Sequence, residues 1–203
     1  VVTANAAVAP DGYTRAEKFA EIASTDNWSV SQPVVTTTST SYIYSIYAKA
    51  AERSWFKLVT KNKANVTVNT WFNASTGAVG TTGHTKAGVD SVGNGWYRCW
   101  VKYDSSTGAT AETFGFDLST VDNGVESYAG TNTWGMYFWG AQLEKGTVPS
   151  SFIFTQATAL TRNNDTVSVT NMNWYNTTLG TVATSAYLPW VGNRSEERRV
   201  GKE

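Results

Sequence analysis

Cysteine, histidine and net charge are all scarce in this sequence of 203 residues, and each scarcity excludes a class of function. The one cysteine, Cys99, cannot form a disulfide within the chain, and its place in an alternating run predicts a small buried side chain rather than a nucleophile. The one histidine, His84, lies in the glycine-rich stretch VGTTGHTKAG, and no cluster of cysteine and histidine has metal-ligand spacing. Acidic and basic residues number 16 each, so no broad field of either sign favours nucleic acid as a partner.

Long apolar runs and catalytic motifs are missing too. No stretch of 18 apolar residues occurs, so we expect no membrane insertion, and the opening VVTANAAVAPDG lacks the pattern of a signal peptide. The acidic residues form no evident pair of facing carboxylates, which a glycosidase needs. Neither a nucleophile elbow nor a phosphate-binding loop is present. We therefore expect a protein that is not an enzyme.

Strand-forming residues are abundant instead. Thirty threonines, nine tryptophans, ten tyrosines and 17 glycines, with few leucines, suit pleated and half-buried surfaces and predict an all-β protein. Turn signals such as NASTG, GNG and VDNG separate runs that predict strands over 41–50, 54–60, 65–72, 84–92, 95–104, 110–118 and 133–144. Short strands at this spacing are typical of a sandwich or barrel, most simply two antiparallel sheets. Residues 14–23 stay open, because TRAEKFAEIA fits both a helix and a strand.

The segment 95–104 alternates two kinds of side chain, which a strand sends to opposite faces. One parity is an ordinary core stripe made of Tyr97, Cys99, Val101 and Tyr103. The other parity carries two indoles and two cations, namely Trp96, Arg98, Trp100 and Lys102. The same outward parity in three further segments holds Tyr47 with Lys49, Trp71 with Asn69, and Trp55 with Lys57.

Outward aromatic rings beside polar side chains are typical of a carbohydrate site, because a ring covers the C–H patches of a sugar while polar groups bind its hydroxyls. The sequence thus predicts a platform on one concave face, provided that the strands share a sheet. Its members are Trp100, Arg98, Trp96, Trp71, Tyr47 and Trp55, with Trp100 as the strongest candidate. The opposing interpretation is that tryptophans in sandwiches fill the core or cover its rim. Tyr137 and Trp139, which share parity with Ala141 and Leu143, are predicted to do so.

Four stretches, in this order, carry a family resemblance: APDGYTRAEKFAE, SYIYSIYAKAAERSW, VGNGWYRCWVKYD and GMYFWGAQLEKGTVPSSFIFT. They resemble a β-sandwich domain common in bacteriophage tail, fibre and head-spike proteins, which is similar to jelly-roll carbohydrate-binding modules. The resemblance covers residues 1–158 and implies an antiparallel jelly-roll sandwich that lacks the family's first strand. Residues 159–193 resemble a linker and the truncated start of a lectin-like, concanavalin A-like sandwich. The charged stretch 194–203 is expected to be disordered and artefactual.

The resemblance implies a non-catalytic module that binds a polysaccharide or a host surface glycan on the extracellular surface of a virion, in a tail fibre or spike. Other virion chains are the second class of partner, and the alternative function is a structural spacer or decoration domain that contacts them. No cofactor is expected. Related jelly rolls often hold a structural calcium ion, but Gly140 and Ala141 stand here where an aspartate ligand would be expected.

Overall fold

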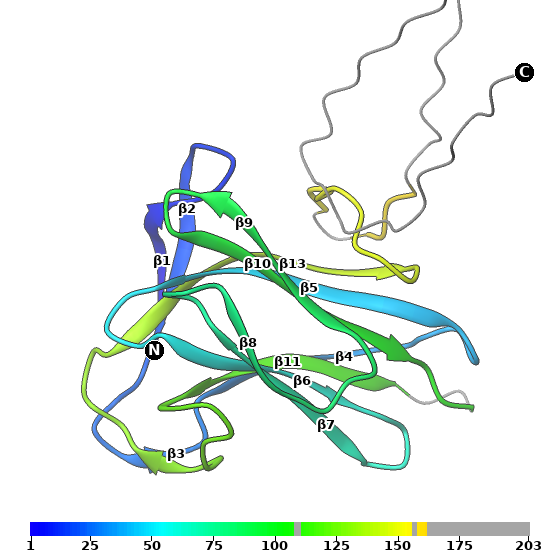
Figure 1. The fold of residues 1–203 in the computed structure, drawn as a ribbon, viewed down its shortest axis with the longest axis horizontal. Coiled ribbons are helices and arrows are strands. Elements are labelled where there is room, and N and C mark those ends of the chain that lie inside the picture. The colour runs from blue at the N-terminus through cyan, green and yellow to red at the C-terminus, as the bar shows by residue number, and fades with distance from the viewer. Residues whose placement is uncertain (108–110, 156–157, 162–203) are drawn as a thin grey trace, which may run out of the picture. The chain divides into compact units, whose positions relative to one another are not determined.

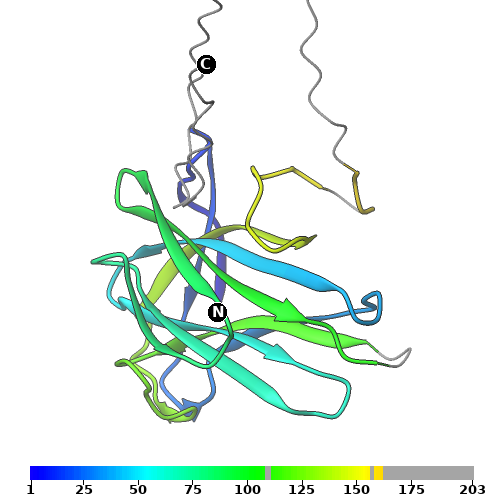
Figure 2. The same cartoon turned by 45° about the vertical axis from the view of Figure 1, so that its right-hand side comes forward.

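The computed structural model describes residues 1–107, 111–155 and 158–161, and its regular structure consists of strands alone (Figure 1). Two antiparallel sheets of six and five strands pack as a sandwich, which confirms the all-β antiparallel jelly-roll class expected from the sequence. Both views show the two layers, with β5 and β10 in one and β6 and β7 in the other (Figure 1, Figure 2).

The six-stranded sheet has, in order, β1 (Val2–Val8), β2 (Thr14–Ala20), β13 (Gly135–Lys145), β5 (Ser41–Ala50), β10 (Trp96–Asp104) and β9 (Ala87–Gly93). The five-stranded sheet has β4 (Ser29–Val34), β11 (Glu112–Ser119), β6 (Trp55–Lys61), β7 (Thr67–Asn73) and β8 (Ala78–Thr82). A further pair, β3 (Thr25–Asp26) and β12 (Tyr128–Ala129), joins two loops. Hairpins such as β6–β7–β8 and β9–β10 stay within one sheet, whereas the chain crosses between the sheets from β4 to β5, from β5 to β6, from β8 to β9 and from β10 to β11.

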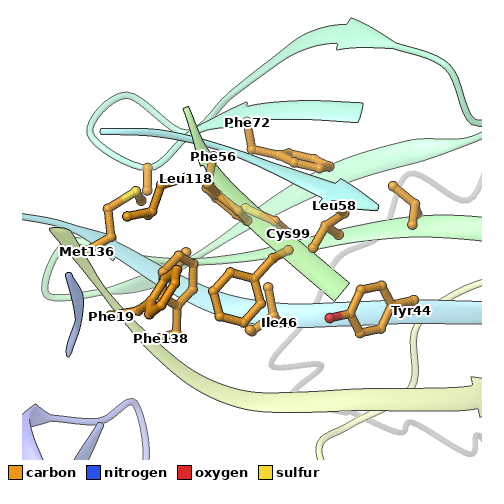
Figure 3. Packing of buried hydrophobic residues seen from close by; sticks show 14 of the residues in the cluster. Phe19, Tyr44, Ile46, Phe56, Leu58, Phe72, Cys99, Leu118, Met136 and Phe138 are labelled. Atoms are coloured by element: carbon orange, nitrogen blue, oxygen red, sulfur yellow. The ribbon is translucent and has the colours of Figure 1, made fainter. Parts of the chain in front are cut away.

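Aromatic rings fill the space between the sheets (Figure 3). Phe116 of the five-stranded sheet lies 4.1 Å from Phe138 of the six-stranded sheet, measured between ring centroids, and Phe56 lies 5.3 Å from the same Phe138. Cys99 is buried in this core, as its parity predicted, and burial raises the pKa of its thiol. The main core thus uses one face of each strand and leaves the other face of both sheets outside.

Every segment predicted as a strand contains one, and the undecided segment 14–23 contains strand β2. Three strands of the two sheets, β1, β4 and β8, were not predicted from the sequence. Strand β4 has the sequence SVSQPV, whose proline and polar residues give no pattern that predicts a strand. It lies at a sheet edge, where a missing backbone N–H and exposed side chains are tolerated. Most of the predicted segment 159–193 and all of the charged stretch 194–203 lie outside the described residues, which end at 161.

Candidate functional site

The six predicted site residues lie on two different sheets. Trp96, Arg98 and Trp100 of β10 and Tyr47 of β5 belong to the six-stranded sheet, whereas Trp55 and Trp71 belong to the five-stranded sheet. All six occupy the parity that faces away from the main core, as the alternation predicted. The strands do not share a sheet, so the condition for a single platform is not met. Two separate outer surfaces have to be considered instead.

Trp96 and Tyr47 are sealed within a second, smaller core on the outer face of the six-stranded sheet. Trp96 is only 2% exposed, and its indole N–H donates to the carbonyl of Val8 at 3.0 Å. Tyr47 is 8% exposed and packs against Trp139 and Phe152, with centroid distances of 5.2 and 6.1 Å. The expectation that Tyr47 lies on a wet face was therefore wrong, because segments distant in sequence cover it.

Tyr137 and Trp139 pack against this second core, so they fill a core as predicted, but the shared face with Leu143 was wrong, because Leu143 packs against the main core. The reason is a bulge in β13. Trp139 pairs with Tyr47 but Gln142 pairs with Ser45, so β13 uses three residues where β5 uses two. Gly140 adopts the left-handed φ of 62° inside this bulge. Because side chains alternate with a period of two, one extra residue reverses every face that follows.

Arg98 is engaged by the protein itself. Its guanidinium donates to the Ser45 hydroxyl at 3.0 and 3.3 Å and to the carbonyl of Ser150, and it lies 3.5 Å from the Glu144 carboxylate. Glu144 in turn accepts the backbone N–H of Ser150 at 2.9 Å. This network ties the segment that follows β13 to the sheet. Arg98 is 5% exposed, so its cation holds a loop rather than facing solvent.

Trp100 is half-buried, whereas the other three candidates on the six-stranded sheet are buried. It stands opposite Ser45 on β5 and Gly88 on β9. A Cβ atom placed on Gly88 would meet three adjacent ring atoms of Trp100 at 2.5, 2.6 and 2.9 Å, so the indole lies directly over this glycine. The buried ring N–H has no hydrogen-bond partner in the described part of the chain. The absence of a side chain at Gly88 thus allows the ring to rest on the sheet surface.

The outer face of the five-stranded sheet holds a charged cluster around Lys57. In register, Lys57 of β6 stands opposite Trp71 of β7 and Asp117 of β11. The Lys57 ammonium lies 3.2 Å from an Asp117 oxygen, 3.5 Å from Glu126 and 5.5 Å from the Trp71 ring centroid. Burial raises the pKa of Asp117, although Lys57 partly opposes the shift. Sequence analysis named Lys57 only as a neighbour of Trp55 and missed its carboxylate partners.

Trp55 is half-buried at the end of the same face, and Trp71 is 7% exposed. A Cβ atom on Gly80 would lie 2.7 Å from the Trp55 ring and 2.3 Å from an oxygen of Asp122, so this loop residue reaches the ring. Asp122 is held there by the backbone N–H and hydroxyl of Thr81, at 2.7 and 3.1 Å. The loop between β11 and β12 therefore covers this surface, and neither indole offers an open platform.

His84, to which sequence analysis assigned no role, is buried between two threonine hydroxyls. Its Nε2 lies 2.9 Å from the Thr60 hydroxyl and its Nδ1 lies 2.8 Å from that of Thr70. The Thr70 oxygen also accepts the backbone N–H groups of Gly83 and His84, both at 3.3 Å. The Thr70 hydroxyl therefore donates its own hydrogen to Nδ1, which acts as the acceptor. The proton of the neutral ring is then on Nε2, which donates to the Thr60 hydroxyl. Burial lowers the pKa of His84 to about 4.

The two best-defined hollows lie along the edge where the sheets part, and none of the six candidates lines them. Their volumes are about 330 and 390 Å³, and core rings such as Phe116 form their walls. Within the described residues, no group of three or more histidine, cysteine, aspartate or glutamate side chains is arranged to hold a metal. The same residues contain no helix that is long and apolar enough to span a membrane.

Comparison with known proteins identifies no family: no family model matches the chain, and no curated protein matches it. What the sequence and structure define together is an all-β sandwich of two antiparallel sheets. One half-exposed indole lies on the outside of the larger sheet, and one buried lysine cluster lies on the outside of the smaller sheet.

Proposed function

We propose that this domain is a non-catalytic carbohydrate-binding module that holds a polysaccharide or cell-surface glycan on the outer face of its six-stranded sheet. Trp100 is the platform. The observation that carries the proposal is the position of this indole over Gly88, where the half-buried ring rests on the strand surface and, among the described residues, no loop residue is placed against it as Asp122 is beside Trp55. A flat ring of this kind suits the C–H patch of a sugar.

Lysine side chains near Trp100 supply the polar groups that a sugar also needs. Lys102 follows two residues later on the same face, and its ammonium bonds both oxygens of Asp104. The backbone N–H of Lys102 donates to the carbonyl of Lys86, which places this exposed lysine, just before β9, beside Lys102. Ammonium and carboxylate groups at the edge of a ring bind sugar hydroxyls and set the orientation of the ring they hold.

The origin suggested by the family resemblance, a virion tail fibre or spike exposed outside the cell, belongs to this proposal. A single site of this size binds weakly, in the millimolar to micromolar range, or about 4 to 8 kcal/mol. Repetition of the module along a fibre raises the avidity without new contacts.

A printed array of bacterial polysaccharides tests the proposal, followed by titration of the best binder. Trp100→Ala should weaken that binding about fivefold, since one lost stacking contact is worth on the order of 1 kcal/mol. Trp134→Ala is the matched control, because it removes an exposed indole from the loop before β13, away from strand β10. Absence of binding to every polysaccharide, or equal effects of the two variants, would refute glycan binding through Trp100.

The second candidate is a structural spacer or decoration domain that contacts other virion chains. The burial of most predicted site residues favours this function, because side chains that already pack within the chain are not free to bind a sugar. These residues are Trp96, Arg98, Tyr47 and Trp71. This function predicts self-association through the remaining aromatic surface. Size-exclusion chromatography with and without oligosaccharide separates the two candidates, since only a lectin-like module changes its behaviour when the sugar is added.

A further inference from the structure

Lys57, Asp117 and Trp71 form a buried row across three strands of the five-stranded sheet. Lys57 lies on the central strand of the three, opposite Asp117 on one side and Trp71 on the other. Their exposed fractions are 2%, 5% and 7%. A lysine ammonium and a carboxylate are both costly to remove from water, and here the ammonium also lies against the ring of Trp71. Such a pair is held in one geometry and shielded from competing water.

A second carboxylate approaches the same nitrogen from the loop between β11 and β12. The Lys57 nitrogen lies 3.2 Å from Asp117 Oδ2 and 3.5 Å from Glu126 Oε1. Unlike Asp117, Glu126 is two-thirds exposed at its side chain, so it connects the buried pair to solvent. The amine, the carboxyl group it faces and a neighbouring proton carrier are thus all within contact distance.

We propose that Lys57 and Asp117 join in an intramolecular isopeptide bond, with Glu126 as the proton carrier. A proton first passes from the ammonium to the Asp117 carboxylate, which leaves a neutral amine and a carboxylic acid. The amine nitrogen then attacks Cγ of Asp117. Glu126 takes a proton from that nitrogen and returns it to the departing hydroxyl group, so that one amide and one water form and the net charge does not change.

Three features of the site favour this condensation. Burial raises the pKa of Asp117 and so favours the acid form of its carboxyl group, the form that the amine attacks. The strand register holds the two groups in contact, which gives a reaction within one chain a large advantage over a bimolecular one. Exclusion of bulk water protects the product from hydrolysis, while the exposed side of Glu126 gives the released water a way out.

The chain offers its own negative control in Lys18 and Glu52. Their charged atoms are 2.8 Å apart, closer than those of Lys57 and Asp117, but their side chains are 19% and 41% exposed. Water therefore stabilises the ionised forms of this surface pair. If distance alone decided the reaction, Lys18 would be crosslinked as well; if burial and a proton carrier decide it, only Lys57 reacts.

Intact mass spectrometry of the purified, unfolded full chain tests the proposal directly. The expected mass is lower than the sequence mass by one water, about 18 Da. Tandem spectra should show a branched peptide in which trypsin no longer cleaves after Lys57. Lys57→Arg and Asp117→Ala should restore the full mass, Glu126→Gln should leave most of the chain unreacted, and the control Glu52→Gln should keep the loss.

Each other outcome overturns a stated part of the proposal. A wild-type chain of full mass, with linear peptides around both residues, excludes the bond without reference to any variant. A loss of water that maps to the Asp11–Gly12 sequence would be a cyclic imide and would exclude it equally. Complete reaction in Glu126→Gln would remove Glu126 from the mechanism and leave Lys57 and Asp117 as the bond.

Discussion

Acidification should destabilise this protein through its single histidine. In the folded state His84 is neutral, with a pKa of about 4, whereas an unfolded chain restores the ordinary value of 6.5. Protonation would place an N–H on Nδ1, facing a Thr70 oxygen that already accepts two backbone N–H groups. The folded ring therefore resists the second proton, and the unfolded state binds more protons as the pH falls below 6.5.

The size of the effect follows from the separation of the two pKa values. A separation of about 2.5 units, from 6.5 to about 4, corresponds to about 3 kcal/mol of stability, fully present above pH 6.5 and lost as the pH falls to 4. At pH 5 about 2 kcal/mol of this is already lost. The buried Glu112 and Glu21 have lowered pKa values, so their losses come at lower pH than most of the His84 loss.

Two measurements check this prediction. The imidazole signals of the only histidine can be followed by NMR from pH 7.5 to 4.5, and they should show no transition near 6.5. Urea unfolding of the wild type and of His84→Gln should then give free energies that converge as the pH falls from 7 to 5. A folded-state transition at the ordinary pKa, or two parallel pH profiles, would refute the reasoning.

Three substitutions give further predictions. Glu21→Gln should cost about 3 kcal/mol in urea unfolding, because the buried carboxylate accepts two bonds from Arg53, at 2.6 and 3.0 Å, and its loss leaves that cation uncompensated. Gly88→Ala should displace the Trp100 indole, since the new methyl group would meet the ring at 2.5 Å; the near-ultraviolet circular dichroism should change while the far-ultraviolet spectrum does not. Gly140→Ala should lower the unfolding free energy by about 1 to 2 kcal/mol through its left-handed φ, and an unchanged thermal midpoint would contradict this.

Face alternation in single strands was predictable from the sequence. Cys99 and Val101 lie in the main core and Trp96 and Trp100 lie on the other face, because the pleat of a strand depends only on neighbouring residues. The same local rule predicted most of the strands that fill the core, but it left β2, which carries the core residue Phe19, undecided. An exposed edge strand such as β4 has no alternation of apolar and polar residues, so this pattern could not predict it.

Coverage of the outer faces was not predictable from local pattern. Trp96 is sealed by Val8, which lies 88 positions earlier in the chain, and Arg98 by Ser150, which lies 52 positions later. Lys57 is likewise shielded by a loop that includes Glu126. The parity of a residue tells which side of the sheet it takes, whereas its exposure depends on segments whose return to that sheet is decided by the whole topology.

The bulge at Gly140 makes the length of β13 as important as its composition. Removing one residue there would restore the regular pleat, and every later side chain of the strand would change sides. The Glu144 carboxylate would then face the packed rings of the core, and Leu143 would face the loop that Arg98 holds. A single-codon deletion would then act as several core substitutions at once. In related sequences, β13 should therefore vary by substitution, whereas insertions and deletions should occur in the turns.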